Sequence, residues 1–190
     1  MISSDLRTYL EKFEGIIFDL DGTLVDLHLR WDDVRLDMHA AFNAECSEDI
    51  PETGISSLID YALTHGCANA RQIAAGVLNK HESSAPFDPV QEVVEVFRTM
   101  QDSKKIAVVT NNLHSTAEYV LKSLGLYNQN ICIIGFDDVK HSKPDPQGIL
   151  RALQVLDITS DQAVMIGDRD SDKTAATEAQ TTFCHVSKFG

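Results

Sequence analysis

The stretch Glu14-Gly15-Ile16-Ile17-Phe18-Asp19-Leu20-Asp21-Gly22-Thr23 decides the expected fold. Its first half is a short apolar run, which predicts a buried β-strand that ends in acidic and glycine-containing sequence. Similar apolar runs predict four more strands, at residues 105–110, 131–135, 163–167 and 182–186. Near-continuous apolar strands are typical of a parallel sheet that is covered on both faces.

Helical patterns lie between these predicted strands. Apolar residues recur at helical spacing in three stretches, 90–100, 117–124 and 149–156. We expect Gly125 to end the second helix, and Asp145 to cap the third with Pro146 as its first residue. Strands that alternate with helices imply right-handed crossovers and an α/β fold with a doubly wound sheet.

The stretch between the first two predicted strands is too long for one crossover. Residues 26–88 carry three helical stripes, at 31–42, 55–62 and 73–78, and no convincing strand. We therefore expect a small all-helical domain at 26–88, inserted into a core formed by 1–25 and 89–190.

Length and charge narrow the possible partners. The 190 residues are 43% hydrophobic, which fits one core with a modest insertion, and 16 Lys and Arg against 29 Asp and Glu give a net charge of −13. This excess argues against a nucleic-acid partner and against docking on anionic lipid. The sequence shows neither a membrane-span pattern nor a signal-peptide pattern, so we expect a cytoplasmic protein. It does not predict the oligomeric state.

The cysteines are scattered along the chain, at positions 46, 67, 132 and 184. Disulfide frameworks and zinc sites favour closely spaced patterns, so we expect four reduced thiols.

Polar residues follow the predicted strands at the points where ligands of a parallel sheet bind. They are Asp19 and Asp21 after the first strand, Thr110 and Asn111 after the second, Lys143 beyond the third, and Asp168 and Asp172 after the fourth. Crowded carboxylates repel one another, and Mg²⁺ is a hard cation that prefers oxygen ligands. We expect Mg²⁺ to be bound by Asp19, Asp168 and the main-chain carbonyl of Asp21.

The other residues of this set suit a phosphoryl group. Lys143 is a point charge for a phosphoryl oxygen, and Thr110 offers a hydroxyl. Asn111 suits either the substrate or the turn itself. One of the paired carboxylates, Asp19 or Asp21, can act as a nucleophile while the other transfers protons. The set therefore predicts phosphoryl transfer, in which positioning and charge neutralisation dominate catalysis.

The segment Phe18-Asp19-Leu20-Asp21-Gly22-Thr23-Leu24 resembles the signature motif of the haloacid dehalogenase-like superfamily. Thr110, Lys143 and the pair Asp168 and Asp172 stand in the order of its other three motifs. The resemblance implies a Rossmann-like core and Mg²⁺-dependent catalysis through an aspartyl-phosphate. It assigns Asp19 as nucleophile, Asp21 as general acid and base, Asp168 as metal ligand and Asp172 as a supporting residue.

Within that family, an acid at the place of Asp21 favours phosphate esters over dehalogenation, and Thr23 is more typical of phosphatases than of mutases. The helical insertion resembles the cap of the phosphoglycolate phosphatase-like branch. We expect a Mg²⁺-dependent phosphatase that hydrolyses a small phosphorylated metabolite. The alternatives are a phosphomutase of the β-phosphoglucomutase type and a non-catalytic phosphoryl receiver or binding protein.

Three further polar residues near these motifs are interpreted as structural. Arg169 and Asp170 are expected to serve local structure, with a surface ion pair as one form of it. His114 is expected at the start of a helix.

Overall fold

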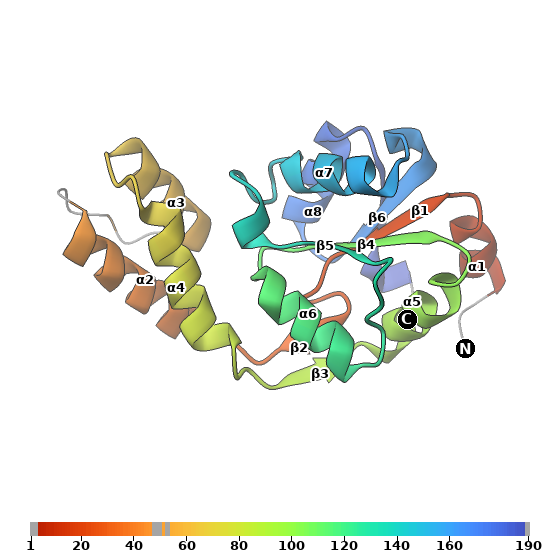
Figure 1. Ribbon diagram of the computed structural model, residues 1–190, viewed down its shortest axis with the longest axis horizontal. Helices are drawn as coiled ribbons and strands as arrows, with labels where there is room; N and C mark the ends of the chain where they lie inside the picture. Colours follow the sequence, from red (N-terminus) through yellow and green to blue (C-terminus); the bar gives the residue numbers. More distant parts are fainter. Residues whose placement is uncertain (1–3, 47–50, 52–53, 189–190) are drawn as a thin grey trace. The chain divides into compact units, whose positions relative to one another are not determined.

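The structure is a computed structural model that describes residues 4–46, 51 and 54–188. Its contacts divide the chain into two compact units, a larger one formed by residues 1–27 and 87–190 and a smaller one formed by 28–86 (Figure 1). The bounds lie two residues inside the predicted insertion at each end.

The larger unit is built on five parallel strands in the order β5-β4-β1-β6-β7. They are β1 (Gly15–Phe18), β4 (Lys105–Val109), β5 (Cys132–Ile134), β6 (Ala163–Gly167) and β7 (Thr182–His185). The order runs outward from β1 in both directions, so the predicted doubly wound parallel sheet is confirmed.

Helices cover both faces of this sheet (Figure 1). The described helices of the larger unit are α1 (Ser4–Leu10), α5 (Gln91–Met100), α6 (His114–Ser123), α7 (Gln147–Leu156) and α8 (Asp170–Glu178). Ile17 belongs to a buried cluster with residues of α7 and α8. Its neighbour Phe18 points to the opposite face, where its ring centroid lies 5.0 Å from that of Phe97 on α5. Alternate residues of the buried strand thus serve two helical layers.

Three short 3₁₀ helices complete the described part of this unit, at Phe136–Asp138, Ser160–Gln162 and Val186–Lys188. The predicted helix ends fall close to their expected places. Gly125 follows the end of α6 with φ +65°, and the carboxylate of Asp145 accepts a hydrogen bond from the Gln147 amide over 2.9 Å. The helix α7 itself begins at Gln147, one residue after the predicted start.

A two-stranded antiparallel pair, β2 (Val25–Leu27) and β3 (Phe87–Pro89), stands where the chain leaves the larger unit and returns to it. The sequence predicts no strand at either place. Each strand has only three residues and one ends in proline, so neither shows a recognisable alternation.

The smaller unit consists of helices in its described residues, as the stripes predict. They are α2 (Trp31–Glu45), α3 (Ile55–Thr64) and α4 (Ala70–Glu82). Val34, Met38 and Phe42 of α2 are fully buried. The carboxylate of Asp37 on α2 lies 2.6 Å from Nζ of Lys80 and 2.8 Å from Nε2 of His81, both on α4.

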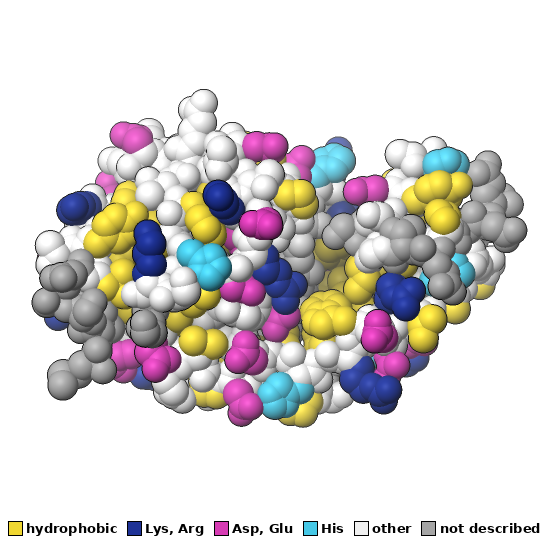
Figure 2. Space-filling model, turned by 180° about the vertical axis from the view of Figure 1, so that it is seen from behind, with side chains coloured by type: hydrophobic (Ala, Val, Ile, Leu, Met, Phe, Trp, Pro, Cys, Tyr) yellow, Lys and Arg dark blue, Asp and Glu magenta, His cyan; other side chains and the backbone are white. Residues whose placement is uncertain are grey.

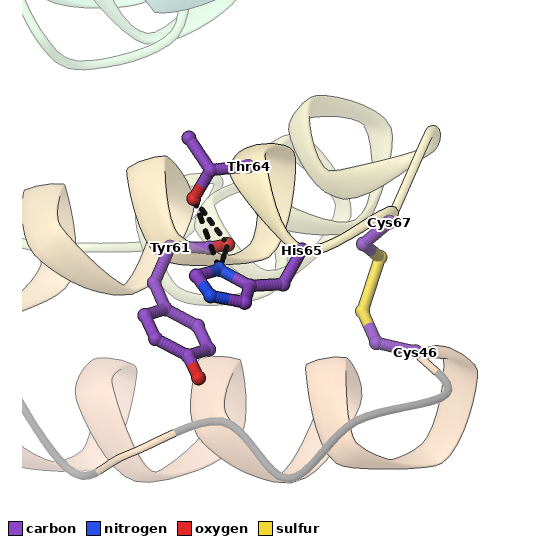
Figure 3. The surroundings of a disulfide bond; sticks show 5 residues. All are labelled: Cys46, Tyr61, Thr64, His65 and Cys67. Carbon is purple, nitrogen blue, oxygen red and sulfur yellow. Dashed lines mark hydrogen bonds between the residues drawn. A yellow bond between two sulfur atoms is a disulfide. The ribbon is translucent and has the colours of Figure 1, made fainter.

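A disulfide bond joins Cys46 to Cys67, so the expectation of four reduced thiols is wrong (Figure 3). Cys46 follows the end of α2, and Cys67 lies in the turn between α3 and α4. The two residues are 21 positions apart in sequence, and only the folding back of α3 brings their Cα atoms to 5.2 Å. Cys132 and Cys184 are buried free thiols, as expected.

The surface mixes both signs of charge. Figure 2 shows acidic side chains scattered among basic and apolar ones on the face that it presents, rather than gathered in one patch. In the part of the chain that the structure describes, no helix has the length and apolar character to cross a bilayer.

Candidate active site

The central strand β1 delivers two aspartates to the carboxyl edge of the sheet. The amide of Asp19 donates to the Ile166 carbonyl over 2.9 Å and so extends the pairing with β6 by one residue. A tight turn follows, in which the Leu20 carbonyl accepts from the amides of Leu24 and Val25 over 2.9 and 3.0 Å. Asp19 and Asp21 are both buried, with exposed fractions of 5% and 7%.

Lys143 lies between two carboxylates, one directly after β1 and one in the first turn of α8. Its Nζ donates to Oδ1 of Asp19 over 2.6 Å and to Oδ1 of Asp172 over 2.5 Å, and all three side chains are buried. Burial alone would lower the pKa of Lys143, but the two carboxylates outweigh it and raise that pKa. The lysine is therefore a fixed positive charge beside Asp19.

Both carboxylate oxygens of Asp172 accept hydrogen bonds, one from Lys143 and the other from the start of α8. Its Oδ2 accepts from the Arg169 amide over 3.0 Å, which caps the helix. A Cβ on Gly167 would lie 2.6 Å from the Asp172 carboxylate, so only glycine allows this close approach. Asp172 thus contacts both Lys143 and the start of α8, and its supporting role stays a prediction.

Asp168 stands opposite Asp19 across the turn after β1. Its Oδ1 accepts from the Thr23 hydroxyl over 3.3 Å. Gly22 has φ +88°, and a Cβ there would lie 2.3 Å from Oδ2 of Asp168, so this turn admits the carboxylate only because it carries glycine.

The residues fit a hard divalent cation. Asp19, Asp168 and Asp172 each offer a carboxylate oxygen, and these atoms lie within 4.8 Å of one another. Since both oxygens of Asp172 already accept hydrogen bonds, Asp19 and Asp168 are the better candidates for direct ligands. Mg²⁺ is usually bound by one or two carboxylates and keeps several waters, which suits this pair.

The charges of the site favour such an ion. Burial raises the pKa of Asp19 to about 6, Lys143 opposes this shift, and the negative charge of Asp172 adds to it. Burial also raises the pKa of Asp21, against the amide of Leu27 and the guanidinium of Arg169. Four carboxylates against one lysine and one arginine leave two negative charges uncompensated, which a divalent cation would neutralise.

Arg169 is the residue that sequence reasoning underrated. Its Nη2 donates to Oδ2 of Asp21 over 3.0 Å, and its Nε lies 3.6 Å from Oδ2 of Asp168. An ion pair of Arg169, which we expected, is present, but its partners are Asp21 and Asp168 of the site rather than surface groups, and Asp170 is exposed. In the sequence, the only sign that Arg169 belongs to the site is that it directly follows Asp168.

The strand β4 ends in a polar turn at the same edge. The amide of Asn112 donates to the Thr110 hydroxyl over 3.1 Å, and this hydroxyl donates to Oδ1 of Asn112 over 3.0 Å. Asn111 donates from Nδ2 to the Lys143 carbonyl over 2.8 Å, and its buried Oδ1 has no hydrogen-bond partner. A buried acceptor without a partner is costly, so Asn111 is suited to a ligand that donates.

Two histidines lie nearby. His114 is the first residue of α6, as expected; its amide donates to Asp137, and its Nδ1 lies 2.6 Å from a carboxylate oxygen of Asp138. His185, at the end of β7, lies with Nε2 3.1 Å from the Asp168 carbonyl oxygen. No predicted ligand role involved either histidine.

Comparison with known proteins agrees with the motif reading. The family model "Haloacid dehalogenase-like hydrolase" matches residues 16–186. Pyrophosphatase PpaX of Listeria monocytogenes serotype 4a is 30% identical over 178 residues, which cover 90% of this chain and 81% of that protein.

Solved structures show the same fold. A hydrolase from Pseudomonas syringae has a TM-score of 0.62 at 26% identity, with 89% of this chain and 82% of that chain covered. CbbY from Rhodobacter sphaeroides, solved in complex with phosphate, has a TM-score of 0.62 at 18% identity, with 91% and 85% covered. The chain belongs to the haloacid dehalogenase-like hydrolases.

Proposed function

We propose that this chain is a Mg²⁺-dependent phosphatase that hydrolyses a small phosphorylated metabolite through an aspartyl-phosphate. The observation that carries the proposal is the pair Asp19 and Asp21 at the end of the central strand, with Lys143 hydrogen-bonded to Asp19. The name of the PpaX relatives adds pyrophosphate to the candidate substrates.

In the first half-reaction, a carboxylate oxygen of Asp19 attacks phosphorus and the bond to the leaving oxygen breaks. Lys143 stays beside Asp19 and offsets the charge of the phosphoryl oxygens. Asp21 donates its proton to the leaving oxygen, which departs as an alcohol or a phosphate. A bound Mg²⁺ would supply positive charge that lets an anionic carboxylate meet an anionic phosphoryl group.

In the second half-reaction, water attacks the phosphorus of the aspartyl-phosphate. Asp21 accepts the proton of that water, the bond between Asp19 and phosphorus breaks, and inorganic phosphate leaves. The Thr110 hydroxyl and the Nδ2 hydrogen of Asn111 that does not bond the Lys143 carbonyl are proposed to bind the phosphoryl oxygens at the end of β4. We further propose that the smaller unit, residues 28–86, is the cap that selects the substrate.

The decisive variant is Asp19→Asn. We expect it to reduce phosphate release at least about a thousandfold, because the amide cannot serve as the nucleophile. Release of inorganic phosphate is measured with Mg²⁺ on pyrophosphate and a panel of sugar phosphates and other phosphorylated metabolites. Asp170→Asn is the matched control: it removes an exposed carboxylate from the same edge and should keep full activity.

Substantial turnover by Asp19→Asn would refute the mechanism. Isomerisation of a sugar phosphate without release of phosphate would instead assign the chain to the phosphomutases.

A further inference from the structure

The two carboxylate oxygens of Asp21 have different partners. Oδ1 accepts from the amide of Leu27 over 2.9 Å, in a buried hydrogen bond to the main chain of β2. Oδ2 accepts from Nη2 of Arg169 over 3.0 Å. The first partner is fixed by the backbone, whereas the second sits at the end of a flexible side chain that is 51% exposed.

This difference decides which oxygen meets a substrate. A leaving oxygen that takes a proton from Asp21 must approach within hydrogen-bond distance of one carboxylate oxygen. Since Oδ1 is held by the buried amide of Leu27, the approach is to Oδ2, where the Arg169 guanidinium now lies. Substrate and guanidinium therefore compete for the same atom.

After the substrate displaces the Arg169 guanidinium from Oδ2 of Asp21, we expect the guanidinium to stay beside the leaving group. Its Nε lies 3.6 Å from Oδ2 of Asp168, which keeps the side chain at this edge of the sheet. Lys143 is buried next to Asp19 and so faces the transferred phosphoryl group. Arg169 lies beside Asp21 and Asp168 instead, so we infer that it faces the leaving group.

We propose that Arg169 selects substrates whose leaving group carries a second anionic group, such as a phosphate or a carboxylate. This inference rests on the phosphatase function proposed above. Moving a guanidinium away from Asp21 breaks a charge-assisted hydrogen bond. An anionic leaving group replaces that bond with another of the same kind, for which the planar fork of arginine is well suited. A neutral leaving group offers no such replacement.

The test compares Arg169→Gln with the wild-type chain on three substrates in Mg²⁺. Pyrophosphate and phosphoglycolate have a second anion, and glycerol 1-phosphate has a neutral leaving alcohol. We expect the ratio of kcat/KM for either of the first two to kcat/KM for the third to fall about ten- to hundredfold, the worth of one hydrogen bond to a charged group. The cap of α8 uses the main-chain amide of residue 169, so the variant keeps it.

Binding gives a readout that does not depend on turnover. With Mg²⁺ present, inhibition by methylenediphosphonate and by phosphonoacetate should weaken in Arg169→Gln, whereas inhibition by methylphosphonate should not. The two arms separate a preference for a second phosphate from one for a carboxylate. Arg169→Lys should restore part of the selectivity. Lys173→Gln removes an exposed cation from the same helix and should alter none of these values.

Two failures are distinguishable. If the wild-type chain releases phosphate from no substrate, the proposed function itself is refuted. If it is active and Arg169→Gln lowers kcat/KM equally for all three substrates, Arg169 only positions Asp21 and the selectivity inference is overturned.

Discussion

Lys143 shows how one buried cation makes this arrangement of carboxylates tolerable. Its Nζ contacts both Asp19 and Asp172, and all three groups are almost completely buried. Without the lysine, two adjacent carboxylates would lose their counter-charge in a place where burial has removed most of their contact with water. With it, one negative charge of the three groups remains, and this charge is available to a metal ion or a proton.

The two free cysteines illustrate the opposite case, in which burial makes a group inert. Burial raises the pKa of Cys132 to about 11, and burial also raises the pKa of the Cys184 thiol. Only the thiolate reacts with alkylating agents, and for a pKa near 11 about one Cys132 in a thousand is ionised at pH 8.

We therefore expect iodoacetamide at pH 8 to modify neither Cys132 nor Cys184 in the folded, oxidised protein. Mass spectrometry should find two modified cysteines after unfolding in urea without reductant, and four after unfolding with reductant. Rapid labelling of Cys132 in the folded protein would contradict the burial seen here.

At this scale the sequence predicted residue types better than residue partners. It singled out Asp19 and Lys143 because each follows a strand motif, although 124 positions separate them. It did not find the pairing of Arg169 with Asp21, whose partners lie 148 positions apart. A charge next to a motif in sequence is usually a solvated surface residue, and only the fold shows where its side chain turns.

Among the elements, the strands of the sheet were the most predictable because their burial leaves a continuous apolar signature. The stripes of α2, α3 and α4 were equally clear. The strands β2 and β3 were missed because they are short, and their pairing joins residues about 60 positions apart in sequence. The disulfide that joins the end of α2 to the turn after α3 was also missed. The packing of the helices brings Cys46 to Cys67, and their spacing in the sequence gives no sign of it.

That disulfide should stabilise the smaller unit. Closing a loop of about 20 residues restricts the unfolded chain and is worth about 3 kcal/mol in the chain-entropy model. We expect dithiothreitol to lower the free energy of unfolding of this unit by about that amount. Trp31 on α2 is the only tryptophan of the chain, so its fluorescence during urea unfolding reports on the smaller unit.

Cys46→Ser provides the matched control. It should unfold at the lower urea concentration with or without reductant, because it has no disulfide to lose. If the urea midpoint of the wild-type chain is the same with and without dithiothreitol, the disulfide does not constrain this unit.

For the whole molecule, the net charge of −13 was at first only an argument against polyanionic partners. Within the site, four acidic groups face two basic ones, and the sign of the local field depends on whether a cation is bound. An acidic protein can bind a phosphate ester when a metal ion and Lys143 reverse that field. Most of the other carboxylates among the described residues are exposed or half-buried. On the face that Figure 2 shows, acidic side chains lie among basic ones.

The raised pKa of Asp19 links the stability of the molecule to pH and to Mg²⁺. Burial raises the pKa of Asp19 in the folded protein to about 6, above its ordinary value of 3.8 in an unfolded chain. Between these values the folded form binds more protons, so this group's contribution to the stability of the metal-free protein is lost as pH rises from about 4 through 6. Mg²⁺ needs the ionised carboxylate and competes with the same proton.

We therefore expect Mg²⁺ to raise the melting temperature clearly at pH 7.5 and much less at pH 5, where Asp19 holds its proton. Differential scanning fluorimetry with and without Mg²⁺ over this pH range measures the effect. Asp19→Asn should lose most of the Mg²⁺ stabilisation at pH 7.5, because the substitution removes the carboxylate ligand altogether. Lowering the pH to 5 only protonates that carboxylate. Equal stabilisation of the wild-type chain at both pH values would place the ion away from Asp19.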